Sequence, residues 1–219
     1  AISERKNEIT LYYKNFRYKV SNSDELLRKA NEHIQMLEKQ RELFDNNIEK
    51  LTSLELRNYP SLNQALSAVQ KGRIIQKISA DLQKYIIELG KEGTLLKTRL
   101  KEITTDVENE TDLVIKDYTR LDMKKSKILL EALSYEEILD KNNVLKILDY
   151  QKPMMMHPVP GWRILSQTSL LESDIAAIIR EAGSLGKAIH SSISFHRTIL
   201  GEEKASAYKE EIERIKLSF

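Results

Sequence analysis

The chain has 219 residues, of which 41% are hydrophobic, 31% charged and only 6% aromatic, a composition typical of a mostly helical protein. Its net charge is +2, so it has no overall basic field and any site for a polyanion must be local. The absence of cysteine excludes disulfides and thiolate metal sites, and no apolar run approaches the ~20 residues that span a bilayer. No secretory signal pattern opens the sequence, and we expect a cytoplasmic protein.

The first 22 residues have the character of strands. The stretch EITLYYKNFRYKV (8–20) combines β-branched and aromatic residues around Lys14-Asn15, which predicts a β-hairpin. Because two strands alone are marginally stable in water, we expect the hairpin to belong to a larger sheet. Since the chain starts at Ala1 inside this pattern, we also expect an N-terminal portion to be missing.

A helical pattern follows over residues 23–150. Ser23 is the expected N-cap of the first helix, and Pro60 is expected to separate that helix from a second long run. Apolar residues recur at alternating spacings of three and four. In the first run they are Leu27, Ala30, Ile34, Leu37, Phe44, Ile48 and Leu51, and in the second Ile75, Ile78, Leu82, Tyr85, Leu89, Leu96, Leu100, Ile103 and Val107. Further helices are predicted over 111–121, 125–133 and 135–148. Such helices should pack side by side as an elongated bundle.

The last part of the chain differs in kind. Three of the four prolines fall within 151–162, which predicts a linker over 151–160. Residues 161–219 hold four of the seven glycines and read as short helices joined by glycine turns. The expected fold is therefore mainly all-α, an elongated helical bundle followed by a small helix-hairpin-helix domain, with a residual β-hairpin at the N-terminus.

Four stretches resemble the DisA family of DNA integrity scanning diadenylate cyclases. GWRILSQTSLLESDIAAIIREAGSLGKAIHSSI (161–193) and LGEEKASAYKEEIERI (200–215) are similar to the helix-hairpin-helix domain that closes these proteins. YIIELGKEGTLL (85–96) resembles their helical linker, and ISERKNEITLY (2–12) resembles the last strands of their cyclase domain. The resemblance assigns 1–22 to the end of a cyclase domain, 23–150 to the linker and 161–219 to the DNA-binding domain.

This resemblance carries implications for activity. The family makes cyclic di-AMP from ATP with Mg²⁺ or Mn²⁺, assembles as an octamer through its cyclase domains, and binds branched DNA in the bacterial nucleoid. Its Asp-Gly-Ala and Arg-His-Arg cyclase motifs occur nowhere in the 219 residues. We therefore expect no enzyme activity, catalytic residue, metal or cofactor in this chain alone, and DNA as its partner.

The resemblance and the glycine turns together select candidate DNA-binding residues. A glycine turn before a helix presents backbone N–H groups to a phosphate, and a nearby basic side chain adds affinity that depends on salt. The candidates are Gly183, Ser184, Gly186 and Lys187 at the first turn, Arg197, Gly201, Lys204 and Ser206 at the second, and Arg163. The second turn has Ile199 where the family has glycine, and Glu202 and Glu203 compete with a phosphate. We therefore expect the first turn to be the better site.

Several alternatives remain open at this point. The glycine turns could serve only to end helices, and Trp162 could cover a small core instead of stacking on a base. Residues 161–219 carry four Arg and four Lys against seven Glu and one Asp, so this domain has no basic excess. The alternative function is a structural spacer or oligomerisation module with a degenerate hairpin and no useful DNA affinity.

Overall fold

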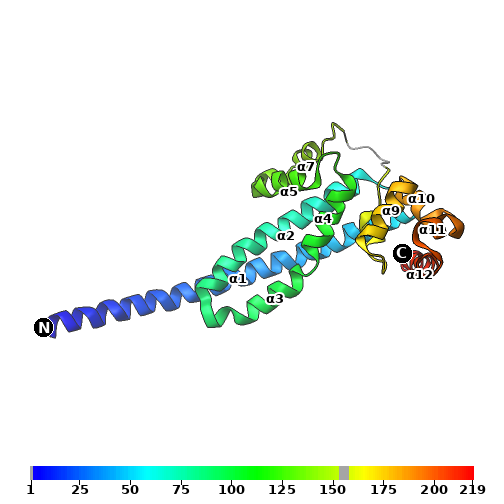
Figure 1. Cartoon of the computed structure of the whole chain (residues 1–219). Helices are drawn as coiled ribbons and strands as arrows, with labels where there is room; N and C mark the ends of the chain where they lie inside the picture. The colour runs from blue at the N-terminus through cyan, green and yellow to red at the C-terminus, as the bar shows by residue number, and fades with distance from the viewer. Residues whose placement is uncertain (1, 153–157) are drawn as a thin grey trace. The chain divides into compact units, whose positions relative to one another are not determined.

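The computed structural model describes the backbone of residues 2–152 and 158–219, and side chains from Asp24 onward (Figure 1). Residues 153–157 of the expected proline-rich linker lie outside the described residues. The helices are α1 Ile2–Leu56, α2 Leu62–Leu89, the 3-10 turn η1 Gly90–Gly93, α3 Thr94–Thr104, α4 Val107–Tyr118, α5 Met123–Ala132, α6 Tyr135–Leu139, α7 Lys141–Ile147, α8 Trp162–Leu165, α9 Glu172–Ala182, α10 Leu185–His190, α11 Ile193–Leu200 and α12 Glu202–Leu217. None of the described helices is long and apolar enough to cross a membrane.

The predicted β-hairpin is absent from the structure. Residues 8–20 lie within α1, and no strand occurs anywhere in 2–152 or 158–219. The helix also runs straight through Ser23, which is therefore not an N-cap. A helix satisfies its backbone N–H and C=O groups within one segment, whereas a two-stranded hairpin leaves its outer edges unpaired. The strand propensity of these residues did not decide their structure, since no partner strand is available among the described residues.

The predicted break at Pro60 is confirmed. After Leu56 the chain leaves the helix through Asn58, whose φ is 61°. The N–H of Tyr59 donates to the carbonyl of Leu54 at 2.8 Å, so the last turn of α1 keeps its acceptors occupied. Pro60 cannot continue a helix, and α2 begins two residues later.

Chain contacts divide the molecule into two units, and the first comprises Ala1–Gln40 with Ile75–Thr105. Within it, Arg99 of α3 forms an ion pair of 2.7 Å with Glu38 of α1, and the His33 ring meets the Tyr85 ring edge-on at 5.2 Å. Gly90 has φ +58°, and a Cβ on Gly93 would lie 2.8 Å from the Ile86 carbonyl oxygen. These two glycines therefore permit the turn between α2 and α3.

The second unit comprises Arg41–Ile74 and Asp106–Phe219. The predicted helix over 135–148 is divided into α6 and α7 by Asp140, whose carboxylate accepts from the N–H of Asn142 at 2.9 Å. Ser134 and Glu137 form a capping box at the start of α6. Local capping thus divides into two short helices a segment that the apolar spacing alone predicted to be one helix.

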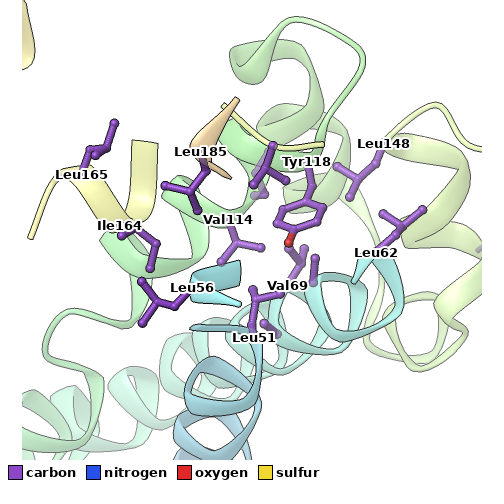
Figure 2. Packing of buried hydrophobic residues seen from close by; sticks show 14 of the residues in the cluster. Leu51, Leu56, Leu62, Val69, Val114, Tyr118, Leu148, Ile164, Leu165 and Leu185 are labelled. Carbon is purple, nitrogen blue, oxygen red and sulfur yellow. The ribbon is translucent and has the colours of Figure 1, made fainter. Parts of the chain in front are cut away.

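A single apolar core fills this second unit. Figure 2 shows labelled side chains from α1, α2, α4, α8 and α10 meeting in one cluster. Its labelled members are Leu51, Leu56, Leu62, Val69, Val114, Tyr118, Leu148, Ile164, Leu165 and Leu185. The cluster also includes Ile175 and Ile178 of α9 and Tyr208 and Ile212 of α12. Residues 161–219 therefore share their core with 41–74 and 106–150, a grouping different from the expected division at 150.

Candidate nucleic-acid interface

The first glycine turn joins α9 to α10. Gly183 ends α9 with φ +73°, and its N–H donates to the Ile179 carbonyl at 2.9 Å. Ser184 then caps α10 by accepting from the N–H of Lys187 at 3.5 Å. A Cβ on Gly183 would meet nothing within 4 Å, so the turn is open on that side. Gly183 thus ends a helix and leaves an accessible turn at the same time.

Gly186 has a different reason to be glycine. A Cβ at this position would lie 2.2 Å from Oδ1 of Asn58, in the turn between α1 and α2. Ser184, Gly186 and Lys187 line an open groove with Asn58. His190 and Ser191 complete the lining of this groove. The first turn is therefore built against a segment far away in the sequence.

Lys187 is the basic residue of this turn. Its side chain is exposed and makes no ion pair within the described part of the chain. In the same part of the chain, the backbone N–H groups of Ser184 and Gly186 have no hydrogen-bond partner. One cation and two N–H donors thus lie together without an acceptor.

The second glycine turn is occupied by its own acidic residues. Gly201 has φ +81° and separates α11 from α12. Arg197 pairs with Glu202 at 2.7 Å, and Lys204 pairs with Asp174 of α9 at 2.7 Å. The Ser206 hydroxyl donates to the Glu202 carbonyl at 3.1 Å, as α-helical residues commonly do. The basic residues predicted here are exposed, but carboxylates already balance their charge.

Arg163 does not lie on the surface, and it is withdrawn from the candidate interface. Its side chain is 0% exposed and is enclosed by Glu55, Glu110 and Thr52. It pairs with Glu55, which is also 0% exposed, and with Glu110 at 3.0 Å. Although burial opposes the charge, these two carboxylates raise the pKa of Arg163 above its ordinary value. The burial of Arg163 could not be predicted from local sequence patterns, because its partners Glu110 and Glu55 lie more than fifty positions away in the chain.

Asp117 completes this buried polar cluster from α4. Its Oδ1 accepts from the N–H groups of Gly161 at 2.9 Å and Trp162 at 2.7 Å, and its Oδ2 accepts from that of Arg163 at 3.0 Å. Burial and, second, the Glu55 carboxylate raise the pKa of Asp117 to about 7, and the three N–H groups only partly oppose this. Asp117 thereby fixes the start of α8, where the chain enters its last helices.

Trp162 packs at the same place. The Lys116 ammonium lies 3.4 Å from the centre of its indole ring and also pairs with Glu172 at 3.2 Å. The side chain is partly buried against the apolar core. This arrangement favours the covering role over base stacking, since the ring is already engaged.

Three residues of the groove, Asn58, His190 and Ser191, were missed by sequence reasoning. Asn58 and His190 have no motif around them, and neither belongs to a glycine turn. The one available signal was Asn58 shortly before Pro60, since Asn tolerates a positive φ at a helix end. Its approach to α10 is a tertiary feature. Among the described residues, no group of three or more His, Cys, Asp or Glu is arranged to hold a metal.

The described residues form an all-α protein whose last helices carry two glycine turns. Residues 20–156 match the family model described as "DisA bacterial checkpoint controller linker region", and the chain belongs to this family. It is similar to the DNA integrity scanning protein DisA of Bacillus subtilis strain 168, with 34% identity covering 98% of this chain and 62% of that protein. It is likewise similar to the DNA integrity scanning protein DisA of Carboxydothermus hydrogenoformans, with 32% identity covering 99% of this chain and 64% of that protein. The chain thus spans less than two thirds of the length of these relatives.

Proposed function

We propose that this chain binds DNA through the sugar-phosphate backbone, without reading base sequence, as the DNA-binding portion of a DisA-like protein. Family membership supports this proposal, because the relatives are named as DNA integrity scanning proteins. The geometry supports it through one observation above all. Lys187 is an exposed cation without an ion pair in the described part of the chain, beside an open glycine turn.

The first turn is proposed as the main contact, and the second as a minor one. A phosphate approaching Lys187 replaces only water, whereas a phosphate approaching Arg197 or Lys204 must displace Glu202 or Asp174. Contacts of this kind position a protein on DNA and carry no sequence information. The groove beside the turn, lined in part by Asn58 and His190, is the place where we propose that the sugar-phosphate backbone of the DNA lies.

For the longer protein we propose a DNA-regulated diadenylate cyclase that makes cyclic di-AMP from ATP with Mg²⁺ or Mn²⁺. Its octameric assembly, its preference for branched DNA and its place in the cytoplasm and nucleoid belong to the same proposal. Several copies of a weak DNA site in one octamer would raise the overall affinity through avidity. No cyclase activity is proposed for the 219 residues alone.

A direct test uses a fluorescent four-way junction and a linear duplex, titrated with the 219-residue chain at about 50 mM and about 200 mM salt. We expect both DNAs to bind, more weakly at the higher salt. Lys187→Glu should lower affinity for both by roughly tenfold, because it removes one phosphate contact and adds repulsion. Fluorescence anisotropy provides the measurement.

Lys204→Glu is the matched control, because it makes the same charge reversal at a lysine that Asp174 already neutralises. We expect it to weaken binding less than Lys187→Glu does. If tens of micromolar protein give no salt-sensitive binding, the alternative of a spacer or oligomerisation module replaces the DNA proposal.

A further inference from the structure

Five basic residues gather around α10 and the end of α1. They are Arg57, Lys187, His190, Lys209 and Lys216, and we refer to them as the α10 basic surface. Sequence reasoning had selected only Lys187 among them. All five lie in the second unit, and α9 to α12 are the neighbouring helices shown in yellow to red in Figure 1.

Hydrogen bonds from α12 bring two of these residues to the C-terminal end of α10. The Lys209 ammonium lies 3.4 Å from the carbonyl oxygen of Ser191, and the Lys216 ammonium lies 3.5 Å from that of Ile189. Unpaired carbonyls at a helix end attract cations. Lys187 and His190 project from α10 itself, so both lysines of α12 extend the same basic region.

The linker contributes the fifth basic residue. Arg57 lines a groove together with Lys216 and with Phe219 at the end of the chain. The next residue, Asn58, lines the adjoining groove with Lys187 and His190. The turn between α1 and α2 therefore lies between the groove lined by Lys216 and the groove lined by Lys187.

Little negative charge opposes this surface. Among the described residues, the five make a single ion pair, between Lys216 and Glu213 at 2.8 Å. The hydrogen bond from Lys216 is the main cause of the lowered pKa of Glu213, and Lys209 and His190 add smaller effects, so these basic side chains lie near the same carboxylate. The second glycine turn offers the opposite case, since each of its basic residues has its own carboxylate.

We propose that duplex DNA lies across the α10 basic surface, so that Arg57 and Asn58 of the linker contact its phosphates together with Lys187, Lys209 and Lys216. This inference rests on the proposed function and names its surface. The basic side chains on this face, of which only Lys216 has an ion pair in the described part of the chain, attract the phosphate backbone and release its counterions. The linker is then part of the DNA reader and not only a spacer between domains.

The test compares Arg57→Gln with Arg197→Gln in the 219-residue chain. Both changes remove one arginine charge from an exposed side chain, but Glu202 already balances Arg197. Fluorescence anisotropy with a linear duplex is measured over a series of salt concentrations. We expect Arg57→Gln to lower affinity by up to about eightfold near 0.1 M salt and to reduce the salt slope by about 0.9, the effect of one lost phosphate contact. Arg197→Gln should stay within about twofold.

Lys209→Gln supplies a second variant on the same surface, at a lysine without an ion pair in the described part of the chain, and should act like Arg57→Gln. Thermal unfolding of all three variants checks that the fold is intact. If the wild-type chain binds and Lys187→Glu weakens it, but Arg57→Gln and Lys209→Gln behave like Arg197→Gln, the linker contribution is rejected and the proposed function stands. If the wild-type chain does not bind, both proposals are rejected.

Discussion

At the scale of single residues, burial decides which charged side chains can meet a ligand. Arg163 and Lys187 are both basic residues of the last sixty, yet one is fully enclosed and the other exposed. A buried guanidinium costs several kcal/mol to desolvate and persists only where carboxylates and hydrogen bonds surround it. Glu55, Glu110 and Thr52 supply these groups, so Arg163 holds α8 against α1 and α4.

Asp117→Asn should destabilise the protein by about 1–3 kcal/mol, because the amide nitrogen cannot accept a hydrogen bond, whereas both oxygens of Asp117 can accept in either protonation state. The pKa of Asp117 is raised to about 7, so the folded state binds a proton more tightly than the unfolded state. Its contribution to stability is therefore largest below about pH 4 and declines as the pH rises toward 7. Urea unfolding at pH 5 and pH 8 should show a larger effect of the substitution at pH 5.

Asp122→Asn is the matched control, because Asp122 is an exposed N-cap of α5 and Asn caps equally well. We expect that variant to be near neutral at both pH values. Equal destabilisation by the two variants would contradict the role assigned to Asp117.

At the scale of helices and turns, the two glycine turns share a plan but differ in surroundings. Both glycines have positive φ, 73° at Gly183 and 81° at Gly201, and neither has an atom within 4 Å of an added Cβ. The two glycines differ in ψ, which is -12° at Gly183 and 169° at Gly201. The turns also differ in the charges beside them, since Lys187 has no ion pair in the described part of the chain while Arg197 has Glu202. A glycine of positive φ therefore does not by itself make a phosphate site.

Gly183→Ala should cost about 1–2 kcal/mol, because an alanine in the left-handed region places its Cβ against the following carbonyl oxygen. No neighbour contributes to this penalty, so it is a property of the backbone. Gly183→Asn should cost less, since Asn tolerates this conformation at helix ends. Chemical denaturation measures the free energy of unfolding of the wild type and of both variants. A Gly183→Asn variant as unstable as Gly183→Ala would show that the conformational argument is wrong.

At the scale of the whole second unit, one core joins the end of the linker to the last helices. Leu51 and Ile164 belong to the same buried cluster although they are more than one hundred positions apart (Figure 2). Because the C-terminal helices bury their apolar faces against α1, α2 and α4, we expect them to unfold together with those helices.

Leu51→Ala should lower the free energy of unfolding by about 2–5 kcal/mol, the usual cost of removing a buried leucine. Trp162 is the only tryptophan and lies in the C-terminal helices, so its fluorescence reports on them. We expect its unfolding midpoint to shift with that of far-UV circular dichroism. A Trp162 transition left unchanged by Leu51→Ala would indicate that residues 161–219 fold independently.

Much of the fold follows from local features that can be read in order along the chain. Pro60 marks the end of α1, and the apolar spacing through Leu82 and Leu89 marks α2. The β-hairpin predicted over 8–20 was wrong, because β-branched and aromatic residues favour a strand only where another strand can pair with it. For the interface, the candidates Ser184, Gly186 and Lys187 line one groove, whereas Arg163 is buried, and its burial depends on distant carboxylates that no local pattern reveals.

The sequence by itself determined that this is a helical protein with two glycine turns near its end, because helix spacing, caps and glycines act over a few residues. Tertiary structure alone decided which charges remain available. It buried Arg163, paired Arg197 and Lys204 with carboxylates, and brought Arg57 beside Lys216. Electrostatic partners act through space and not along the chain, so the surface proposed to face DNA became visible only once the helices were packed.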